Sequence, residues 1–307
     1  MTAGIREILV PLDGSGPAEW AVPTAAAIAR QSGARIHLML VHASLARAFP
    51  DVTAAGFLDR WEDEQRERET EYVQRIARRL RAVGLDALPE TVVGDPASRI
   101  VERGARSDLV VVTSHGWAGP DRAWLGSVAD AVVHHVRKPV LVLRPDSEDP
   151  PDDPGMHHPG FRRDLVATDG GDAARAAEAF GADVARLFHA TLMLFRAVRV
   201  PAGPSSPYIP HAAVLDREAT AEWEEEARQY LEARAKELTG PDIHVQVDTT
   251  YHTARAILDA AIGTGADLVA VGTHREGRLA RAVLGSVADK VVRGAAVPVV
   301  VAHADRS

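Results

Sequence analysis

The feature that most constrains this sequence is that it repeats itself once. The six residues Leu125–Asp130, Leu-Gly-Ser-Val-Ala-Asp, occur again at Leu284–Asp289, 159 positions later. A shorter motif precedes each copy at a matching distance, Asp108-Leu109-Val110 in the first half and Asp267-Leu268-Val269 in the second. An identical six-residue segment with collinear neighbours predicts a duplicated domain, so one fold has to explain both halves.

The two copies are separated by a segment that favours neither helix nor strand. Residues 146–160 are rich in proline and aspartate, a composition typical of an extended linker. We therefore predict one domain over residues 1–145, a linker over 146–160 and a second domain over 161–307. A length of 307 residues is sufficient for two domains of ordinary size.

Within each copy, apolar runs alternate with stretches of helical periodicity. In the first copy we expect strands at residues 5–12, 36–41, 87–93, 109–113 and 140–143. We expect helices at residues 17–30, 59–83 and 97–105, and another that starts at Ser127. The second copy repeats this order from Asp164 to Ala302, with its long helix near residues 213–238. Alternating elements of this kind predict an α/β fold in which helices cover both faces of a parallel sheet.

One loop of each copy carries the residues most suited to binding an anion. A strand leads through Gly126-Ser127, or Gly285-Ser286, into the start of a helix. Glycine lets backbone N–H groups approach a ligand closely, and a helix N-terminus favours negative charge. The serine hydroxyl is expected either to cap the helix or to contact the anion. Ligands of such sheets bind beyond the carboxyl ends of the strands, where Asp13 and Asp169 also lie.

Composition excludes several other kinds of site. The chain has no cysteine, so disulfides and zinc–thiolate sites are excluded. A net charge of −8 argues against a nucleic-acid-binding surface, and no apolar run is long enough to span a membrane. The first residues do not resemble a signal peptide, so we expect a cytoplasmic protein. Arginine dominates the positive charge, which we interpret as the codon bias of a bacterium.

These motifs resemble those of the universal stress protein family, and the resemblance covers almost all of both halves. Members that bind ATP have a Gly, two residues, a Gly, nine residues, a Gly and then Ser or Thr. An Asp ends their first strand. The resemblance implies two tandem Rossmann-like domains of the adenine nucleotide alpha hydrolase-like type, each a five-stranded sheet of order 3-2-1-4-5. It implies ATP as the ligand, with Mg²⁺ as a candidate companion. The implied nucleotide-binding residues are Asp13, Gly14, Val41, Gly94, Thr113, His115, Gly116, Gly126, Ser127 and Val128 in the first copy, and Asp169, Gly272, His274, Arg275, Gly285, Ser286 and Val287 in the second.

Each copy departs from the family pattern at a different place. The first copy has Thr113 where the family has its first glycine, and it keeps Gly94-Asp95-Pro96 before a helix. The second copy has Arg275 at the second glycine and Tyr251 where the first copy has Gly94. Because bulky side chains can fill the space of a ligand, we expect the first copy to bind nucleotide more tightly.

Three functions compete at this point. The first is a nucleotide-binding regulatory protein of the stress response with little or no turnover. The second is a slow ATP-hydrolysing enzyme, although the Gly-x-x-x-x-Gly-Lys-Ser/Thr loop of common NTPases is absent. The third is a stress protein that has lost nucleotide binding and acts through protein contacts.

The residues themselves also allow plainer structural interpretations. Gly126 and Gly285 could serve only tight packing, and Asp13 and Asp169 could only bond to backbone N–H groups in a turn. Neighbouring residues of an extended segment point in opposite directions, so we expect no catalytic pair of Ser114 with His115, or of its counterparts in the second copy. No catalytic residue and no protein metal site are expected.

The family resemblance also implies how the domains associate. Family members commonly dimerise through the fifth strand, so strands 140–143 and 298–302 are expected to pair within this chain about a pseudo-twofold axis. Unpaired apolar edge strands would otherwise promote aggregation. A homodimer of the whole chain is a further expected assembly.

Overall fold

The computed structural model describes residues 4–44, 55–114, 125–145, 160–200, 212–273 and 284–304, with side chains in the two long helices from Arg60 and Ala219 onward. The chain divides into two compact units, residues 1–159 and 160–307. The expected pairing of residues 140–143 with 298–302 stays a prediction.

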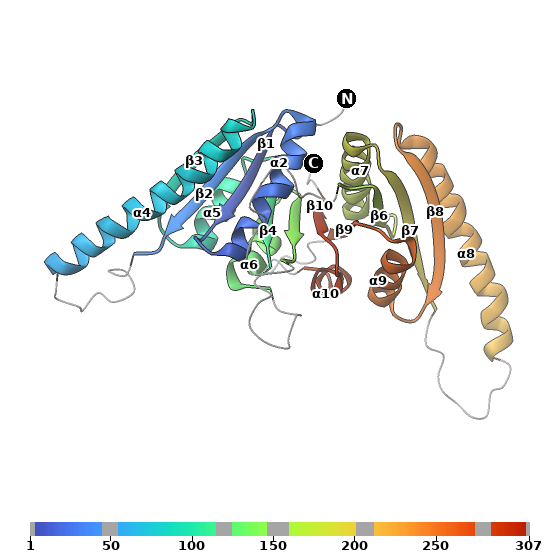
Figure 1. Ribbon diagram of the computed structural model, residues 1–307. Helices are drawn as coiled ribbons and strands as arrows, with labels where there is room; N and C mark the ends of the chain where they lie inside the picture. The colour runs from blue at the N-terminus through green and yellow to red at the C-terminus, as the bar shows by residue number, and fades with distance from the viewer. Residues whose placement is uncertain are drawn as a thin grey trace. The chain divides into compact units, whose positions relative to one another are not determined.

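The first unit is a parallel sheet in the order β3-β2-β1-β4-β5. Figure 1 shows its helices on both sides of the strands. Its elements are β1 (Glu7–Leu12), α1 (Gly16–Glu19), α2 (Ala21–Ser32), β2 (Arg35–His42), α4 (Ala55–Ala82), β3 (Ala87–Val93), α5 (Pro96–Gly104), β4 (Leu109–Thr113), α6 (Ser127–His135) and β5 (Val140–Leu143).

The second unit has the same topology, in the order β8-β7-β6-β9-β10. Its elements are β6 (Arg163–Ala167), α7 (Asp172–Phe188), β7 (Thr191–Arg199), α8 (Ala212–Glu237), β8 (Asp242–Thr250), α9 (Thr253–Thr264), β9 (Leu268–Thr273), α10 (Ser286–Gly294) and β10 (Val299–His303). In each unit the strands follow the order 3-2-1-4-5 when numbered along that copy, which confirms the expected fold class.

The helix expected over residues 17–30 is interrupted at Trp20. Proline lacks an N–H group, so Pro23 cannot donate to the carbonyl of Glu19, four residues earlier. The chain forms one short helix that Ser15 caps through the N–H of Ala18, and then a second helix from Ala21. The matching helix of the second unit, α7, has no proline and is continuous over 17 residues.

The central strands are buried on both faces, as their apolar composition predicts. Ile8, Leu9 and Val10 of β1 are 0% exposed. β6 departs from this pattern at Asp164, which is 2% exposed and whose two carboxylate oxygens have no hydrogen-bond partner in the described structure. The strand registers place Asp164 where the first unit has Ile8.

The repeated Asp-Leu-Val motif has a structural role. The carboxylate of Asp108 accepts hydrogen bonds from the backbone N–H groups of Arg6 and Glu7, at 2.9 and 3.0 Å. Asp267 accepts from Arg162 and Arg163 in the same way, at 3.0 Å. In both units this side chain anchors the start of the first strand to the start of the fourth.

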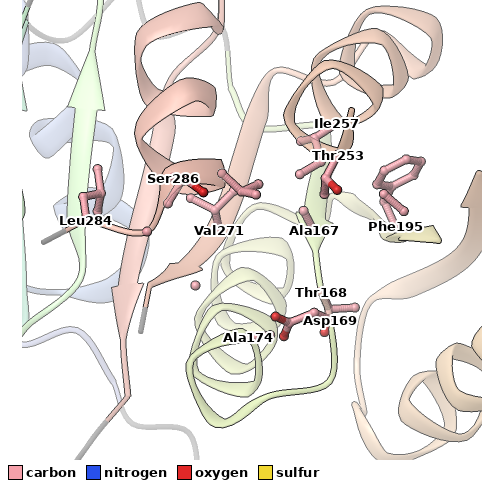
Figure 2. Close-up of a pocket in the computed structure, with 15 residues that line it drawn as sticks. Ala167, Thr168, Asp169, Ala174, Phe195, Thr253, Ile257, Val271, Leu284 and Ser286 are labelled. Carbon is pink, nitrogen blue, oxygen red and sulfur yellow. The ribbon is translucent and has the colours of Figure 1, made fainter. Parts of the chain in front are cut away.

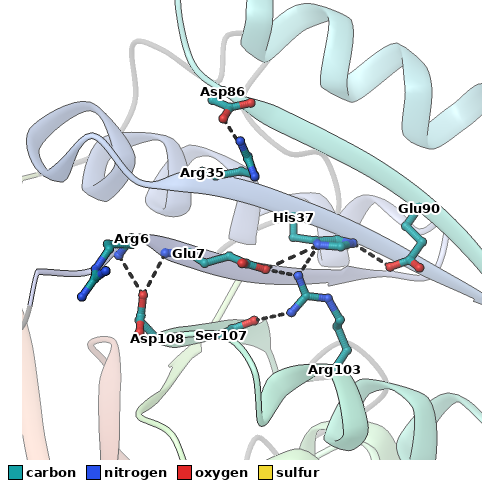
Figure 3. A network of polar contacts seen from close by, with 9 residues as sticks. All are labelled: Arg6, Glu7, Arg35, His37, Asp86, Glu90, Arg103, Ser107 and Asp108. Carbon is teal, nitrogen blue, oxygen red and sulfur yellow. Dashed lines mark hydrogen bonds and ion pairs between the residues drawn. The ribbon is translucent and has the colours of Figure 1, made fainter.

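A buried histidine links three strands of the first unit to α5 (Figure 3). The Arg103 guanidinium donates to Nδ1 of His37 and also pairs with Glu7. Because Arg has only donors, Nδ1 must accept, which leaves the His37 proton on Nε2, 2.6 Å from a carboxylate oxygen of Glu90. Burial, followed by the charge of Arg106, lowers the pKa of Arg103. The cluster lies toward the amino ends of the strands, away from the edge where ligands of this fold bind.

Among the described residues, no helix combines the length and apolarity needed to cross a bilayer.

Candidate nucleotide site

A cavity of about 470 Å³ opens at the carboxyl ends of β6 and β9 in the second unit. This is within the range of small-molecule sites, about 300–1,000 Å³. Figure 2 shows its walls, which come from the central strands and from the first turns of α9 and α10. The lining residues are Ala167, Thr168, Asp169, Ala174, Phe195, Ala197, Thr253, Ile257, Val271, Gly272, Leu284, Gly285, Ser286, Val287 and Ala288.

The start of α10 presents backbone donors to this cavity. Gly285 is the N-cap residue and Ser286 is the first helical residue, and no side chain of the described residues caps the helix. The N–H of Gly285 donates to the hydroxyl of Thr273 at 3.2 Å. The first N–H groups of a helix have no acceptor within it, so those of the first turn remain available to an anion.

Of the two roles expected for the serine hydroxyl, capping the helix or contacting the anion, the structure contradicts the first. Ser286 sits one residue too late, inside the helix, and it is exposed. Ser127 occupies the same first helical position in α6, after N-cap Gly126, and it makes no capping bond either. The glycine before each serine has an extended backbone, with φ of −59° and −56°.

Neither the conformation of Gly285 nor its contacts with the described residues require glycine at this position. Its φ is negative, and a Cβ placed on it would meet no described atom within 4 Å. The space that a side chain would take is therefore open, at the mouth of a row of backbone donors. This geometry opposes the interpretation that Gly285 serves only close packing.

Gly272 differs from Gly285. A Cβ there would lie 2.3 Å from the carbonyl oxygen of Ala173 and 2.6 Å from the nitrogen of Ala174. Gly272 therefore allows the end of β9 to pack against the first turn of α7, although it also lines the cavity. The first unit has Thr113 at the matching position, 8% exposed, beside the helix that is interrupted at Trp20.

Asp169 follows β6 and lines the cavity. One of its carboxylate oxygens accepts from the N–H of Gly171 at 2.9 Å. Asp13 accepts from the N–H of Ser15 at the same distance and from its hydroxyl at 2.6 Å. In both units the aspartate therefore forms the expected hydrogen bond to a backbone N–H group in its turn. Both aspartates are exposed, so the turn bond and contact with a ligand are compatible.

The wall opposite α10 contains apolar side chains that the candidate residues did not include. Phe195 and Ala197 come from β7, and Ile257 and Thr253 come from the first turns of α9. Ala197 matches Val41, because the registers align Ile36 with Leu192. Adding the same offset to Val41 predicts Ala197 from the sequence alone. No sequence motif marks Phe195 or Ile257 as residues of the cavity.

The first unit places its candidate residues at the same edge of its sheet. Gly94 follows β3 with a φ of 157°, a conformation that favours glycine. The side chain of Arg99 lies against it. Asp95 caps α5 through the N–H of Ser98, and Pro96 opens that helix. Val41 lies in β2 and is partly exposed, and Val128 lies in the first turn of α6. Gly14 has a φ of 85° in the turn after β1.

Tyr72 of α4 lies near Asp13 and Glu19. Burial, and after it the negative charge of Glu19, raises the pKa of its hydroxyl. The phenol therefore stays protonated at neutral pH.

Four candidate residues lie outside the described part of the chain: His115, Gly116, His274 and Arg275. Within the described part, no group of three or more His, Asp or Glu side chains comes together as a metal site.

Comparison with known proteins agrees with the duplication and with the fold. The family model described as "Universal stress protein family" matches this chain twice, over residues 4–144 and 160–303. The chain belongs to the universal stress protein family. Both compact units are universal stress protein domains, so this is a tandem member.

Two relatives among the curated proteins align with most of this chain. A universal stress protein of Mycobacterium tuberculosis is 30% identical over 233 residues, which are 72% of each chain. One from Mycolicibacterium smegmatis is 26% identical over 303 residues, 96% of each chain. A solved universal stress protein of Archaeoglobus fulgidus superimposes with a TM-score of 0.71, at 21% identity, over 97% of this chain and 98% of that one. At that identity, this structural match supports the fold alone.

Proposed function

We propose that this universal stress protein binds adenine nucleotide, ATP above all, at the carboxyl edge of its sheets. The observation that carries the proposal is Gly285, whose missing side chain leaves open space beside the uncapped start of α10. The phosphates would take this space and accept hydrogen bonds from the N–H groups of the first turn. Proteins commonly use glycine where the backbone approaches a ligand closely, because glycine has no side chain to block the contact.

The rest of the cavity fits the remaining parts of a nucleotide. An adenine ring requires apolar walls, and Ala197 and Ile257 line the cavity with apolar groups, with the buried Phe195 beside them. Asp169 offers a carboxylate oxygen as an acceptor for a ribose hydroxyl. It is also the one charged side chain among the described lining residues. Recognition in this site would therefore depend on backbone donors and shape more than on basic side chains.

The proposed role is regulatory, with little or no turnover of the nucleotide, in the cytoplasm. ATP would act as a ligand whose presence changes what the protein does in the stress response. A companion Mg²⁺ would be held by the phosphates more than by the chain, because the described lining residues supply a single carboxylate. Sustained release of phosphate above background would contradict this role and favour a slow hydrolase.

The two sites are proposed to be unequal. The sequence favours the first unit, which keeps Gly94-Asp95-Pro96, whereas the cavity described above lies in the second. Replacing Gly126 or Gly285 separately with Val measures each contribution by the same change. We keep the expectation that the Gly126 variant loses more affinity, and the reverse result would reverse the ranking.

The first experiment is to purify the protein, denature it and identify the small molecules released by mass spectrometry. An adenine nucleotide in stoichiometric amount is the expected result. Protein without bound nucleotide that also fails to bind added ATP would contradict the proposal. The chain would then act through protein contacts.

A further inference from the structure

The second unit contains a buried polar cluster directly behind the loop that carries Asp169. At its centre is Glu178 of α7, which is 0% exposed. One carboxylate oxygen accepts from the hydroxyls of Thr168 and Tyr230, at 2.5 and 3.2 Å. The other accepts from Nε of Arg234 at 2.7 Å. Glu178 thus joins the end of β6 to two side chains of the long helix α8.

The same cluster shapes the loop itself. The Thr168 hydroxyl, which donates to Glu178, also accepts from the N–H of Gly170 at 3.2 Å. Gly170 has a φ of 87°, and a Cβ there would lie 3.3 Å from the Tyr230 ring. The loop is therefore held from behind by Glu178 and Tyr230, while its front presents Asp169 to the cavity.

The fold does not need this cluster. In the first unit, Leu12 stands at the position of Thr168 and Val22 at that of Glu178, and both are 4% exposed. The alignment is secure because the helices that follow end at matching left-handed residues, Gly33 and His189. Apolar residues fill these two places in one copy of the same fold.

Burying a charged pair in place of apolar side chains is costly. Desolvation of such a pair often outweighs its attraction, and apolar replacements are frequently neutral or stabilising. Burial alone would lower the pKa of Arg234, yet the hydrogen bond and charge of Glu178 outweigh it and raise that pKa. Arg234 therefore stays charged beside Glu178. A polar cluster that stability does not require needs another explanation.

We infer that Glu178 is a positioning residue that couples helix α8 to the ligand-binding loop of the second unit. The inference depends on the proposed nucleotide site. A ligand that contacts Asp169 fixes the loop, and the loop fixes Thr168, Glu178 and the facing turns of α8. Because coupling between two places is reciprocal, whatever orders or displaces α8 also changes affinity in the cavity.

The test uses the full chain and three substitutions measured with ATP by calorimetry. Thr168→Val removes the hydroxyl that joins loop to cluster, Thr168→Ser keeps it, and Glu178→Gln removes the charge. We expect Thr168→Val and Glu178→Gln to weaken binding to the second unit about tenfold, and Thr168→Ser to restore most of it. Each is made in a Gly126→Val background, so that the second site dominates the signal. Glu225→Gln, an exposed change on the same helix, is the matched control and leaves affinity unchanged.

A second readout separates coupling from simple destabilisation. Hydrogen exchange of α8 peptides should slow when ATP binds the unsubstituted protein and its Thr168→Ser variant. It should not respond to ATP in the folded Thr168→Val variant at ligand concentrations that saturate the site.

The outcomes are distinguishable. If the unsubstituted chain binds no ATP, the proposed function fails. If it binds ATP but Thr168→Val and Glu178→Gln bind equally well, or if α8 exchange still responds to ATP in Thr168→Val, the coupling is refuted and the proposed function stands.

Discussion

We expect Asp164 to make the stability of the second unit fall as pH rises. Its carboxylate is 2% exposed, it has no hydrogen-bond partner in the described structure, and the strands on either side are apolar. Burial, and after it the negative charge of Asp267, raises the pKa of Asp164 to about 8 from an ordinary 3.8. The folded protein therefore keeps a proton that the unfolded chain releases near pH 4.

The sign and size follow from this difference in pKa. Below about pH 4 both states carry the proton, and this group adds no pH dependence. Between about pH 4 and pH 8 the folded state binds more protons than the unfolded state, so the free energy of unfolding falls with rising pH. Each pKa unit corresponds to about 1.4 kcal/mol, so a shift of about four units amounts to roughly 5–6 kcal/mol as an upper bound.

The test substitution is Asp164→Ile, because the first unit has an isoleucine, Ile8, at the matching position. We expect the variant to be several kcal/mol more stable than the unsubstituted chain at pH 8. At pH 4.5, only the smaller cost of a buried neutral carboxyl, about 1–3 kcal/mol, should separate the two. The assay is urea unfolding at several pH values, followed by hydrogen exchange of peptides from β6 and α7. Peptides from β1 and α2 of the first unit serve as the internal control.

The reciprocal change, Ile8→Asp, should transfer the same pH dependence to the first unit. If the pH dependence of the second unit is the same with Ile at position 164 as with Asp, the carboxyl is not the cause and the reasoning is refuted.

Two substitutions test the stability of the second unit, and a salt titration tests how ATP is bound. Gly272→Ala should lower the free energy of unfolding of the second unit by about 1–3 kcal/mol, because its Cβ would overlap the backbone of Ala173; an unchanged urea midpoint would contradict this. His189→Gly should raise that free energy by up to about 1 kcal/mol, because His189 has a φ of 55° where the first unit has Gly33; a fall would contradict it. ATP affinity measured between 50 and 200 mM salt should fall far less than the ~10³-fold or more of a protein built on Lys and Arg contacts, and a steep fall would show that arginine side chains dominate binding.

The fold could be predicted because both halves of the sequence show the same alternation of apolar strands and helices. Strands 109–113 and 140–143 have the bounds that the sequence predicts, since continuous apolar runs between helices mark buried parallel strands. Strand 87–93 also has its predicted bounds, although it is an edge strand with a single buried residue. The split of the first helix at Trp20 was missed, although Pro23 is a visible signal for it. Because proline has no N–H group, the carbonyl four residues before it loses its helical partner. The break therefore lies before Pro23 and not at the proline itself.

The candidate site was predicted in outline from its glycines, and their individual roles needed coordinates. The sequence treats Gly272 and Gly285 alike, but one packs against a helix and the other faces open space. The serine after each motif glycine looked like a cap, and only the backbone angles place it inside the helix. Glu178 could not be predicted, because its partners lie 10, 52 and 56 residues away and no local pattern joins them.

The most direct test of the nucleotide site is calorimetric titration of the full chain with ATP, comparing the unsubstituted protein with Gly126→Val, Gly285→Val and the double variant. A valine at Gly285 points into the open space beside α10 and blocks its N–H groups. Lost bonds to a charged group cost about 1.5–3 kcal/mol each, so each site should weaken at least about tenfold. The account predicts saturable binding by the unsubstituted chain, partial loss in each single variant and affinity at least about tenfold weaker at both sites of the double variant. Unchanged ATP affinity in the double variant would contradict it, because the phosphates would then bind elsewhere.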